Sequence, residues 1–222
     1  MIRAVLFALL LASPAAAQER ILAMGDSILS WHEGRGQSVP DAVALQLRTP
    51  VENRAVAGAR ISHPNALARL AGFDIRDQVP EDSYDWILAN GGGNDLRDEC
   101  GCTGCDATLD SLVTADGRSG EIPALVDRLL PRTDRLLWIG YYPVSIYGGP
   151  FAACAAELDQ LATRLQAMAA LRPRVHYLDT GRAMPPGALR YYAPDLTHPS
   201  PEGAARIGAL AARTMREIAR QP

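Results

Sequence analysis

The sequence predicts an α/β fold in which a parallel sheet is covered by helices on both faces. Short apolar runs of strand length alternate along the chain with longer segments that carry apolar residues at helical spacing. This alternation is typical of repeated strand–helix–strand units, whose strands are parallel and buried. The chain has 222 residues, 48% apolar and 21% charged, which suits one globular domain with a full core.

Five apolar segments are expected to form the strands of this sheet. Each is short, rich in aliphatic and aromatic residues, and followed by glycine or polar residues that end the run. The five segments are 20–24, 51–57, 84–90, 135–141 and 175–179.

Four longer segments are expected to form helices, namely 40–47, 122–130, 152–171 and 201–219. Ser200 and Pro201 stand where the N-cap and the first-turn residue of the last helix belong. Ser119 and Glu121 are similarly placed to cap the helix predicted over 122–130.

Two segments, 96–118 and 143–151, are expected to be unusually long loops. Long ordered loops that follow strands are where α/β domains hold their ligands. Both loops are therefore expected near a functional site.

The first 17 residues predict a signal peptide. Arg3 supplies a positive charge, residues 4–12 are apolar, and the alanines at 15–17 fit the small-residue rule for cleavage. The apolar run is too short to cross a membrane, and no cysteine directly follows the alanines to carry a lipid. We therefore expect a mature chain of 18–222 that forms a single domain, with no stable membrane anchor and a periplasmic or secreted location.

The cysteines fit an exported protein. Cys100, Cys102, Cys105 and Cys154 are even in number, and in an oxidising compartment they favour two disulfides. We expect one bridge within the segment 100–105 and one from that segment to Cys154. The alternative is a structural zinc site, but such sites usually show paired C-x2-C spacings.

Composition and motifs exclude several functional classes. The net charge of −3 and the pI of about 5.8 argue against a nucleic-acid partner. The sequence has no Walker A motif, no G-x-G-x-x-G, no H-E-x-x-H and no serine in G-x-S-x-G. We expect neither a cofactor nor a metal.

Five residues near the predicted strand ends and the last helix could together perform acyl transfer. Ser27, Gly58 and Asn94 follow the first three strands, and Asp195 and His198 precede the last helix. Each alone has an ordinary explanation: the serine as a helix cap, glycine and asparagine as turn residues, the histidine as a structural residue. Together they supply a nucleophile, a base, a carboxylate that orients the base, and donors for an oxyanion.

These residues stand in four blocks that resemble those of the SGNH hydrolases, the GDSL esterase/lipase family. Gly25-Asp26-Ser27 matches the first block, Gly58 the second, Gly92-Gly93-Asn94-Asp95 the third and Asp195-Leu196-Thr197-His198 the fourth, in the family's order. The blocks span most of the predicted mature chain. The chain departs from the family mainly in its cysteine-bearing segment after Asn94.

The resemblance implies a flavodoxin-like three-layer sandwich with a five-stranded parallel sheet in the order 2-1-3-4-5, and a metal-free mechanism. Ser27 would be the nucleophile, His198 the base and then the acid, and Asp195 the residue that orients His198. The oxyanion hole would consist of the Ser27 and Gly58 backbone N–H groups and the Asn94 side chain. The implied activity is that of a carboxylic ester hydrolase.

The resemblance is compatible with a small-molecule or a polysaccharide ester as substrate, with a short or a long acyl group. Trp31, Tyr142 and Tyr192 are candidates for the substrate pocket, because aromatic rings could flank an acyl chain or stack on a sugar. The nearby aromatic residues His32, Tyr141, Tyr147 and Tyr191 are candidates for the same reason. His63, Arg60 and Arg97 lie beside the motif blocks as further candidate contacts. Two other functions use the same fold, an O-acetyl transferase acting on carbohydrate and a catalytically silent binding module.

Overall fold

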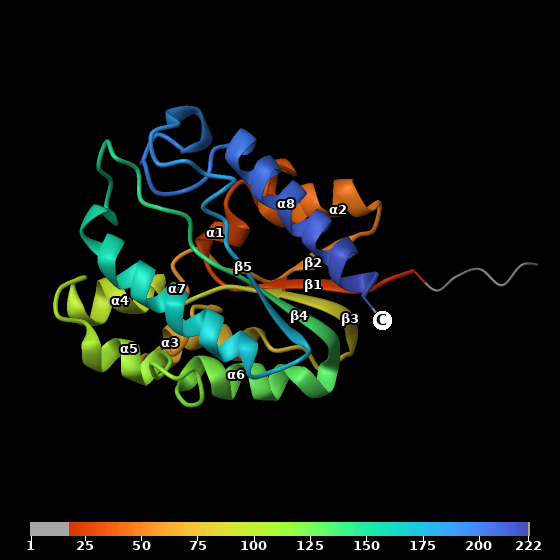
Figure 1. Ribbon diagram of the computed structural model, residues 1–222, viewed down its shortest axis with the longest axis horizontal. Helices are drawn as coiled ribbons and strands as arrows, with labels where there is room; N and C mark the ends of the chain where they lie inside the picture. The colour runs from red at the N-terminus through yellow and green to blue at the C-terminus, as the bar shows by residue number, and fades with distance from the viewer. Residues whose placement is uncertain (1–17, 222) are drawn as a thin grey trace, which may run out of the picture.

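The computed structural model describes residues 18–221, and its centre is a sheet of five parallel strands in the order β2-β1-β3-β4-β5 (Figure 1). The strands are β1 (Ile21–Met24), β2 (Val51–Asn53), β3 (Tyr84–Ala89), β4 (Thr133–Ile139) and β5 (Val175–Leu178). The predicted fold class and strand order are confirmed. The predicted signal peptide, 1–17, lies outside the described residues.

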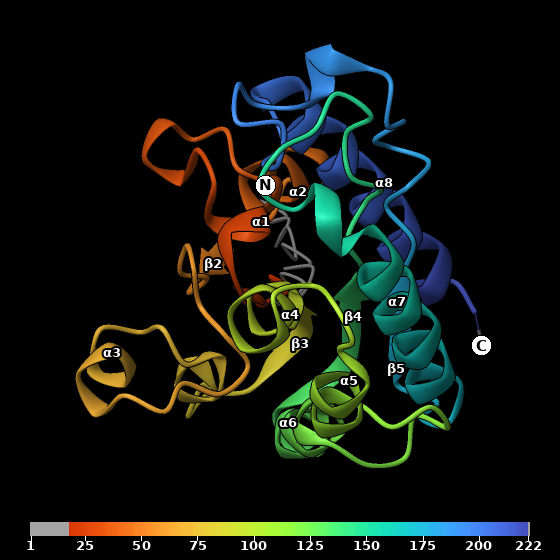
Figure 2. The same ribbon diagram turned by 90° about the vertical axis from the view of Figure 1, so that its left-hand side faces the viewer.

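Helices cover the sheet on both faces (Figures 1 and 2). One face carries α1 (Ser27–Ser30), α2 (Val39–Leu47) and α8 (Pro201–Ala219). The other carries α4 (Gly93–Cys100), α5 (Asp106–Leu112), α6 (Glu121–Leu129) and α7 (Ala155–Ala170), with α3 (Ala66–Leu70) beside them. The 3-10 turns are η1 (Glu33–Arg35), η2 (Ile75–Gln78), η3 (Leu130–Arg132), η4 (Ala152–Cys154) and η5 (Leu189–Tyr191).

The alternation of side chains along each strand builds two separate cores. In β4, Leu136 and Trp138 pack under α5, α6 and α7, whereas Leu137 and Ile139 pack under α2 and α8. All four are fully buried. Because both faces of the sheet are covered, the strands appear in the sequence as continuous apolar runs rather than as alternating ones.

The N-terminal cap predicted for α8 is confirmed, and the one predicted for α6 is wrong. The Ser200 hydroxyl accepts from the Gly203 N–H at 3.1 Å, and Pro201 is the first residue of α8. The N-cap of α6 is Gly120, with no side-chain hydrogen bond. A Cβ at Gly120 would lie 2.5 Å from the Leu112 carbonyl oxygen. The N-cap residue therefore packs too closely against α5 to carry a side chain, and a serine does not occupy this position.

Two predicted boundaries also need correction. The segment 96–118 is not a continuous loop, because it contains the end of α4 and all of α5. The second strand ends at Asn53, and residues up to Gly58 form an irregular connection and a turn. Among residues 18–221, no helix is long and apolar enough to span a bilayer.

Candidate active site

Ser27 is the first residue of α1, at the carboxyl end of β1. Asp26 caps this helix, and its carboxylate accepts from the Ile28 N–H at 2.9 Å. Gly25 has a φ of 143°, and a Cβ there would lie 1.9 Å from the Asn90 side-chain oxygen. The tight turn between β1 and α1 thus requires glycine. This turn presents the Ser27 hydroxyl at the edge of the sheet.

Ser27, His198 and Asp195 form a continuous hydrogen-bonded chain. The Ser27 Oγ lies 2.9 Å from His198 Nε2, and His198 Nδ1 lies 2.5 Å from an Asp195 carboxylate oxygen. The other oxygen accepts from the backbone N–H groups of Thr197 and His198, at 3.0 Å each. With Nδ1–H donating to the carboxylate, Nε2 is left as the acceptor for the Ser27 hydroxyl.

The surroundings of Asp195 favour its ionised form. Partial burial raises the pKa of Asp195, but the hydrogen bonds from the His198 side chain and from the backbone N–H groups outweigh it, so the pKa lies below its usual value. An ionised carboxylate at this position fixes the plane and tautomer of the imidazole ring and can stabilise an imidazolium.

Three groups are predicted as donors for an oxyanion: the backbone N–H groups of Ser27 and Gly58 and the side-chain amide of Asn94. Within residues 18–221, neither the Ser27 N–H nor the Gly58 N–H donates to another group of the protein. The Asn94 side-chain amide donates to the Ala59 carbonyl at 2.9 Å, which ties it to the Gly58 turn and leaves its second hydrogen free. Asn94 lines the pocket at Ser27, whereas Gly58 is not among the lining residues.

A buried network joins the Ser27 turn to the Asn94 turn. The Tyr141 hydroxyl donates to the Asp26 carboxylate at 2.5 Å and accepts from the Gly93 N–H at 2.9 Å. The Asn90 amide also donates to Asp26, at 2.7 Å. Burial raises the pKa of Asp26, and these hydrogen bonds oppose the rise without cancelling it. Burial, together with the neighbouring Asp26 carboxyl, raises the pKa of Tyr141 well above 10. Tyr141 therefore stays protonated and holds both turns at once.

A small apolar pocket of about 40 Å³ opens beside Ser27 and Asn94. Thr197 contributes a buried hydroxyl that has no hydrogen-bond partner in the described part of the chain. The other inner walls are almost wholly apolar. They include Val144, Phe151, Ala152, Leu158 and Leu196.

The aromatic residues predicted for the pocket take different positions, and Tyr141 is among those that line it. Tyr142 lines the pocket, and its hydroxyl donates to the Thr197 carbonyl at 2.7 Å. Tyr192 lies behind it, buried, with the two rings edge to face at 5.7 Å. Trp31 does not line the pocket but stacks on the His198 ring.

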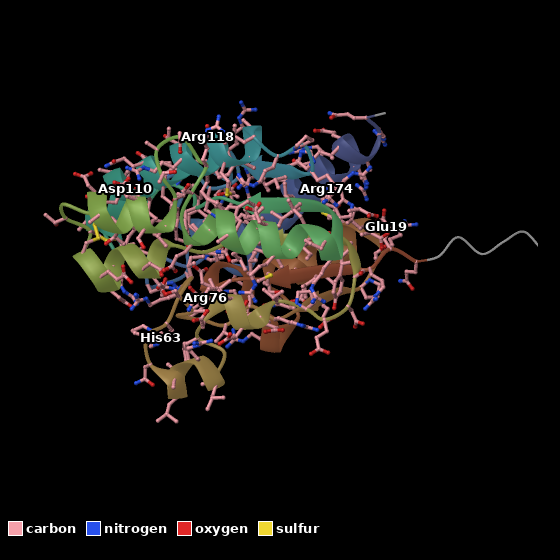
Figure 3. The ribbon with its side chains drawn as sticks, turned by 90° about the horizontal axis from the view of Figure 1, so that it is seen from below. Glu19, His63, Arg76, Asp110, Arg118 and Arg174 are labelled. Atoms are coloured by element: carbon pink, nitrogen blue, oxygen red, sulfur yellow. A yellow bond between two sulfur atoms is a disulfide. The ribbon has the colours of Figure 1, made fainter. Side chains whose placement is uncertain are left out.

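The further candidate contacts have partners within the protein. Arg60 pairs with Glu99 and lies 3.7 Å from Asp95, and Arg97 pairs with Asp98. His63 lies in the segment that leads into α3, where its Nδ1 accepts from a backbone N–H (Figure 3). None of the three lines the pocket at Ser27.

All four cysteines are oxidised, in the pattern expected from the sequence. Cys100 pairs with Cys105, and Cys102 pairs with Cys154. The zinc alternative is contradicted because these sulfurs are all in disulfides. In the part of the chain described, no group of three histidine, cysteine or acidic side chains is arranged to hold a metal ion.

The bridging role of Tyr141 and most of the pocket wall could not be predicted from the sequence. Phe151 and Ala152 reach the site only through the folded path of the segment 143–151. The signals available were the length of that segment and the presence of Cys154 just after it.

Comparisons with known proteins identify the family and the fold of the chain. The sequence profile of the GDSL-like Lipase/Acylhydrolase family matches residues 23–206. A comparison with curated protein sequences finds no match.

Among solved structures, a carbohydrate acetylesterase from Sinorhizobium meliloti is similar, with a TM-score of 0.64, 15% identity, and coverage of 90% of this chain and 99% of that one. An acetylxylan esterase from Geobacillus stearothermophilus gives a TM-score of 0.60 at 18% identity, covering 94% and 98%. A GDSL-like lipase from Bacteroides thetaiotaomicron gives 0.61 at 18% identity, covering 93% and 92%. At these identities the likeness establishes a shared fold.

Proposed function

The chain belongs to the GDSL-like lipase/acylhydrolase family, and from this membership we propose that it is an exported serine hydrolase of carboxylic esters. The observation that carries the proposal is the hydrogen-bonded chain from Ser27 through His198 to Asp195. A serine hydroxyl is a weak nucleophile until a base held in the correct tautomer can take its proton. Here that base and its orienting carboxylate lie within hydrogen-bonding distance.

In the first half of the reaction, Ser27 Oγ attacks the ester carbonyl carbon. His198 Nε2 takes the hydroxyl proton, and Asp195 stabilises the imidazolium through Nδ1–H. The carbonyl oxygen becomes an oxyanion, for which the Ser27 and Gly58 N–H groups and the Asn94 amide are the donors. When the tetrahedral intermediate collapses, His198 gives its proton to the departing alcohol, and an acyl-Ser27 ester remains.

In the second half, a water molecule takes the place of the alcohol. His198 removes a proton from the water as its oxygen attacks the acyl carbon, and the same donors hold the second oxyanion. Collapse breaks the bond to Ser27 Oγ, which regains its proton from His198. The products are the carboxylic acid and the free enzyme.

Two observations support export. The first 17 residues have the charge, apolar run and small residues of a signal peptide. The two disulfides suit an oxidising compartment. N-terminal sequencing of protein from the periplasm or the medium of expressing cells tests this: a chain that begins at Gln18 is expected, and an intact Met1 on a cytosolic protein would contradict it.

The test of the activity is hydrolysis of p-nitrophenyl acetate by the mature chain, beside Ser27→Ala and Ser30→Ala. Ser30 lies on the same short helix, and its buried hydroxyl has no partner in the described chain, so it is a matched control. Ser27→Ala is expected to lower kcat by at least about 10³-fold, with an unchanged Tm, while Ser30→Ala keeps most of the activity. Equal activity in Ser27→Ala and the parent would contradict the proposal.

A further inference from the structure

The pocket beside Ser27 has the chemistry of an acyl site. An ester bound for attack divides at its carbonyl group, with the acyl chain on one side and the alcohol on the other. Apolar walls stabilise a hydrocarbon by removing it from water. A sugar would lose the water on several hydroxyls, and among the described residues that line the pocket only Thr197 offers a buried side-chain hydroxyl without a partner. The acyl part therefore enters this pocket, and the alcohol stays outside it.

The pocket is also small. Its volume of about 40 Å³ has room for a few non-hydrogen atoms. Leu158, which is 8% exposed and packs in the core of the α5–α7 face, is among its walls. Lengthening the pocket on that side would require a core residue to move.

Two contacts with α4, the helix that carries Asn94, hold the wall formed by Phe151 and Ala152 in place. The guanidinium of Arg97, on α4, lies 5.1 Å from the centre of the Phe151 ring. Two residues after Ala152, Cys154 is bonded to Cys102, which follows α4 directly after Gly101. A cation–π contact and a covalent bond thus both join this wall to the helix that supplies the oxyanion donor.

The part of the wall formed by Leu196 is held by close backbone packing. Leu196 has a φ of 58°, and a Cβ at Gly149 would lie 3.0 Å from the Leu196 carbonyl oxygen. The segment 143–151 therefore packs directly against the turn between Asp195 and His198. Neither wall can move without disturbing a neighbouring element of the site.

From this geometry we propose that the Cys102–Cys154 bridge and Phe151 limit the acyl pocket to short acyl groups of about two to four carbons. The substrates are then short-acyl esters, acetyl esters above all, of an alcohol that remains in solvent. This inference rests on the proposed ester hydrolase function and specifies its substrate class.

The experiment is a chain-length series, with p-nitrophenyl acetate, butyrate, hexanoate and octanoate as substrates. It compares the parent, Phe151→Ala, the double variant Cys102→Ala/Cys154→Ala, and Tyr147→Ala. Tyr147 lies in the same segment but is 56% exposed and does not line the pocket, so it is the matched control. Each rate is corrected by subtracting that of Ser27→Ala.

The parent and Tyr147→Ala are expected to lose at least about 100-fold in kcat/KM between acetate and octanoate. In Phe151→Ala and in the double cysteine variant, the ratio of kcat/KM on octanoate to kcat/KM on acetate is expected to be at least about 10-fold higher than in the parent. If the double variant does not fold, the parent assayed after reduction of its disulfides tests the bridge instead, and Phe151→Ala tests the wall.

Three results would overturn the inference. A parent that cleaves octanoate as well as acetate would refute the small pocket and leave the ester hydrolase standing. An unchanged chain-length profile in Phe151→Ala, or in the folded double cysteine variant, would refute the role of that residue or of the bridge. A folded parent that cleaves none of the four esters would refute the proposed function, and the inference with it.

Discussion

The indole ring of Trp31 lies flat against the imidazole ring of His198, with 3.7 Å between the ring centres and 8° between their planes. The backbone N–H of Trp31 donates to the Ser27 carbonyl at 2.9 Å. One residue therefore contacts both the proposed nucleophile and the proposed base. A flat aromatic face also attracts a cation, so this contact strengthens when His198 becomes an imidazolium.

Replacing Trp31 should slow the reaction without preventing it. A cation–π contact of this kind is worth about 0.5–2 kcal/mol, so Trp31→Ala is expected to lower kcat by roughly 2- to 30-fold. Trp31→Phe keeps an aromatic face and should retain most of the activity. Steady-state kinetics on p-nitrophenyl acetate measures both, and equal kcat values for Trp31→Ala and the parent would rule out this contribution.

Replacing Asn94 should remove a donor for the oxyanion. Asn94→Ala is expected to lower kcat by about 10²–10³-fold, the usual loss for one such donor, with a small change in KM. Its hydrogen bond to the Ala59 carbonyl is lost as well, so the Tm is measured alongside kcat. If the rate stays near that of the parent while the Tm falls, Asn94 is a turn residue and not an oxyanion donor.

The stability of the fold should depend on Asp95, whose side chain is buried. Burial raises the pKa of Asp95 to about 7, although the Ile61 N–H and the Arg60 guanidinium favour the ionised form. The folded state then binds a proton that the unfolded chain, with the ordinary value of 3.8, has released. This group therefore lowers the free energy of unfolding as the pH rises through the window between these two values.

Asp95→Asn removes this titration and keeps an oxygen that can accept from Ile61. Between about pH 4.5 and pH 7.5, the Tm of Asp95→Asn should fall less steeply with rising pH than the Tm of the parent. Asp82→Asn, at an exposed carboxylate, is the control. Parallel curves for the parent and Asp95→Asn would show that Asp95 does not titrate in this window.

The two disulfides should contribute unequally to stability. The bonded cysteines are 52 residues apart in Cys102–Cys154 and 5 apart in Cys100–Cys105. Loop-closure entropy then gives about 4 kcal/mol for the first and about 2 kcal/mol for the second. Urea unfolding of the two double-alanine variants measures the difference, and an equal loss would show that chain entropy does not set their contributions.

Much of the fold could be predicted because strong local patterns coincide with the elements. The strands were located to within a few residues, and the helix predicted over 201–219 matches α8. Local signals failed for α4, because it buries only one large apolar side chain, Leu96, and lacks an apolar stripe. Its position depends on glycines at both ends and on Asp95 accepting from the Ile61 N–H, which are tertiary features.

The residues of the candidate site also fall into two groups, those that a local sequence motif predicts and those that only tertiary contacts bring into place. Ser27, Asn94, Asp195 and His198 stand in short motifs with a fixed order, so their convergence could be expected from a parallel sheet. The bridging role of Tyr141 could not, because its partner Gly93 is 48 residues away and the tyrosine otherwise resembles the end of a buried strand. Pocket walls such as Phe151 depend on the path of an irregular segment.

The Cys102–Cys154 bond has a further consequence for proteolysis. Residues 143–151 lie between the two bonded cysteines, and they include the exposed side chains of Ile146 and Tyr147, where a protease could cut. A cut there would place Ser27 on one fragment and His198 on the other. The disulfide would still hold both fragments in one covalent molecule, which would separate on a gel only after reduction. A chain nicked at this segment would thus keep the proposed nucleophile and the proposed base together.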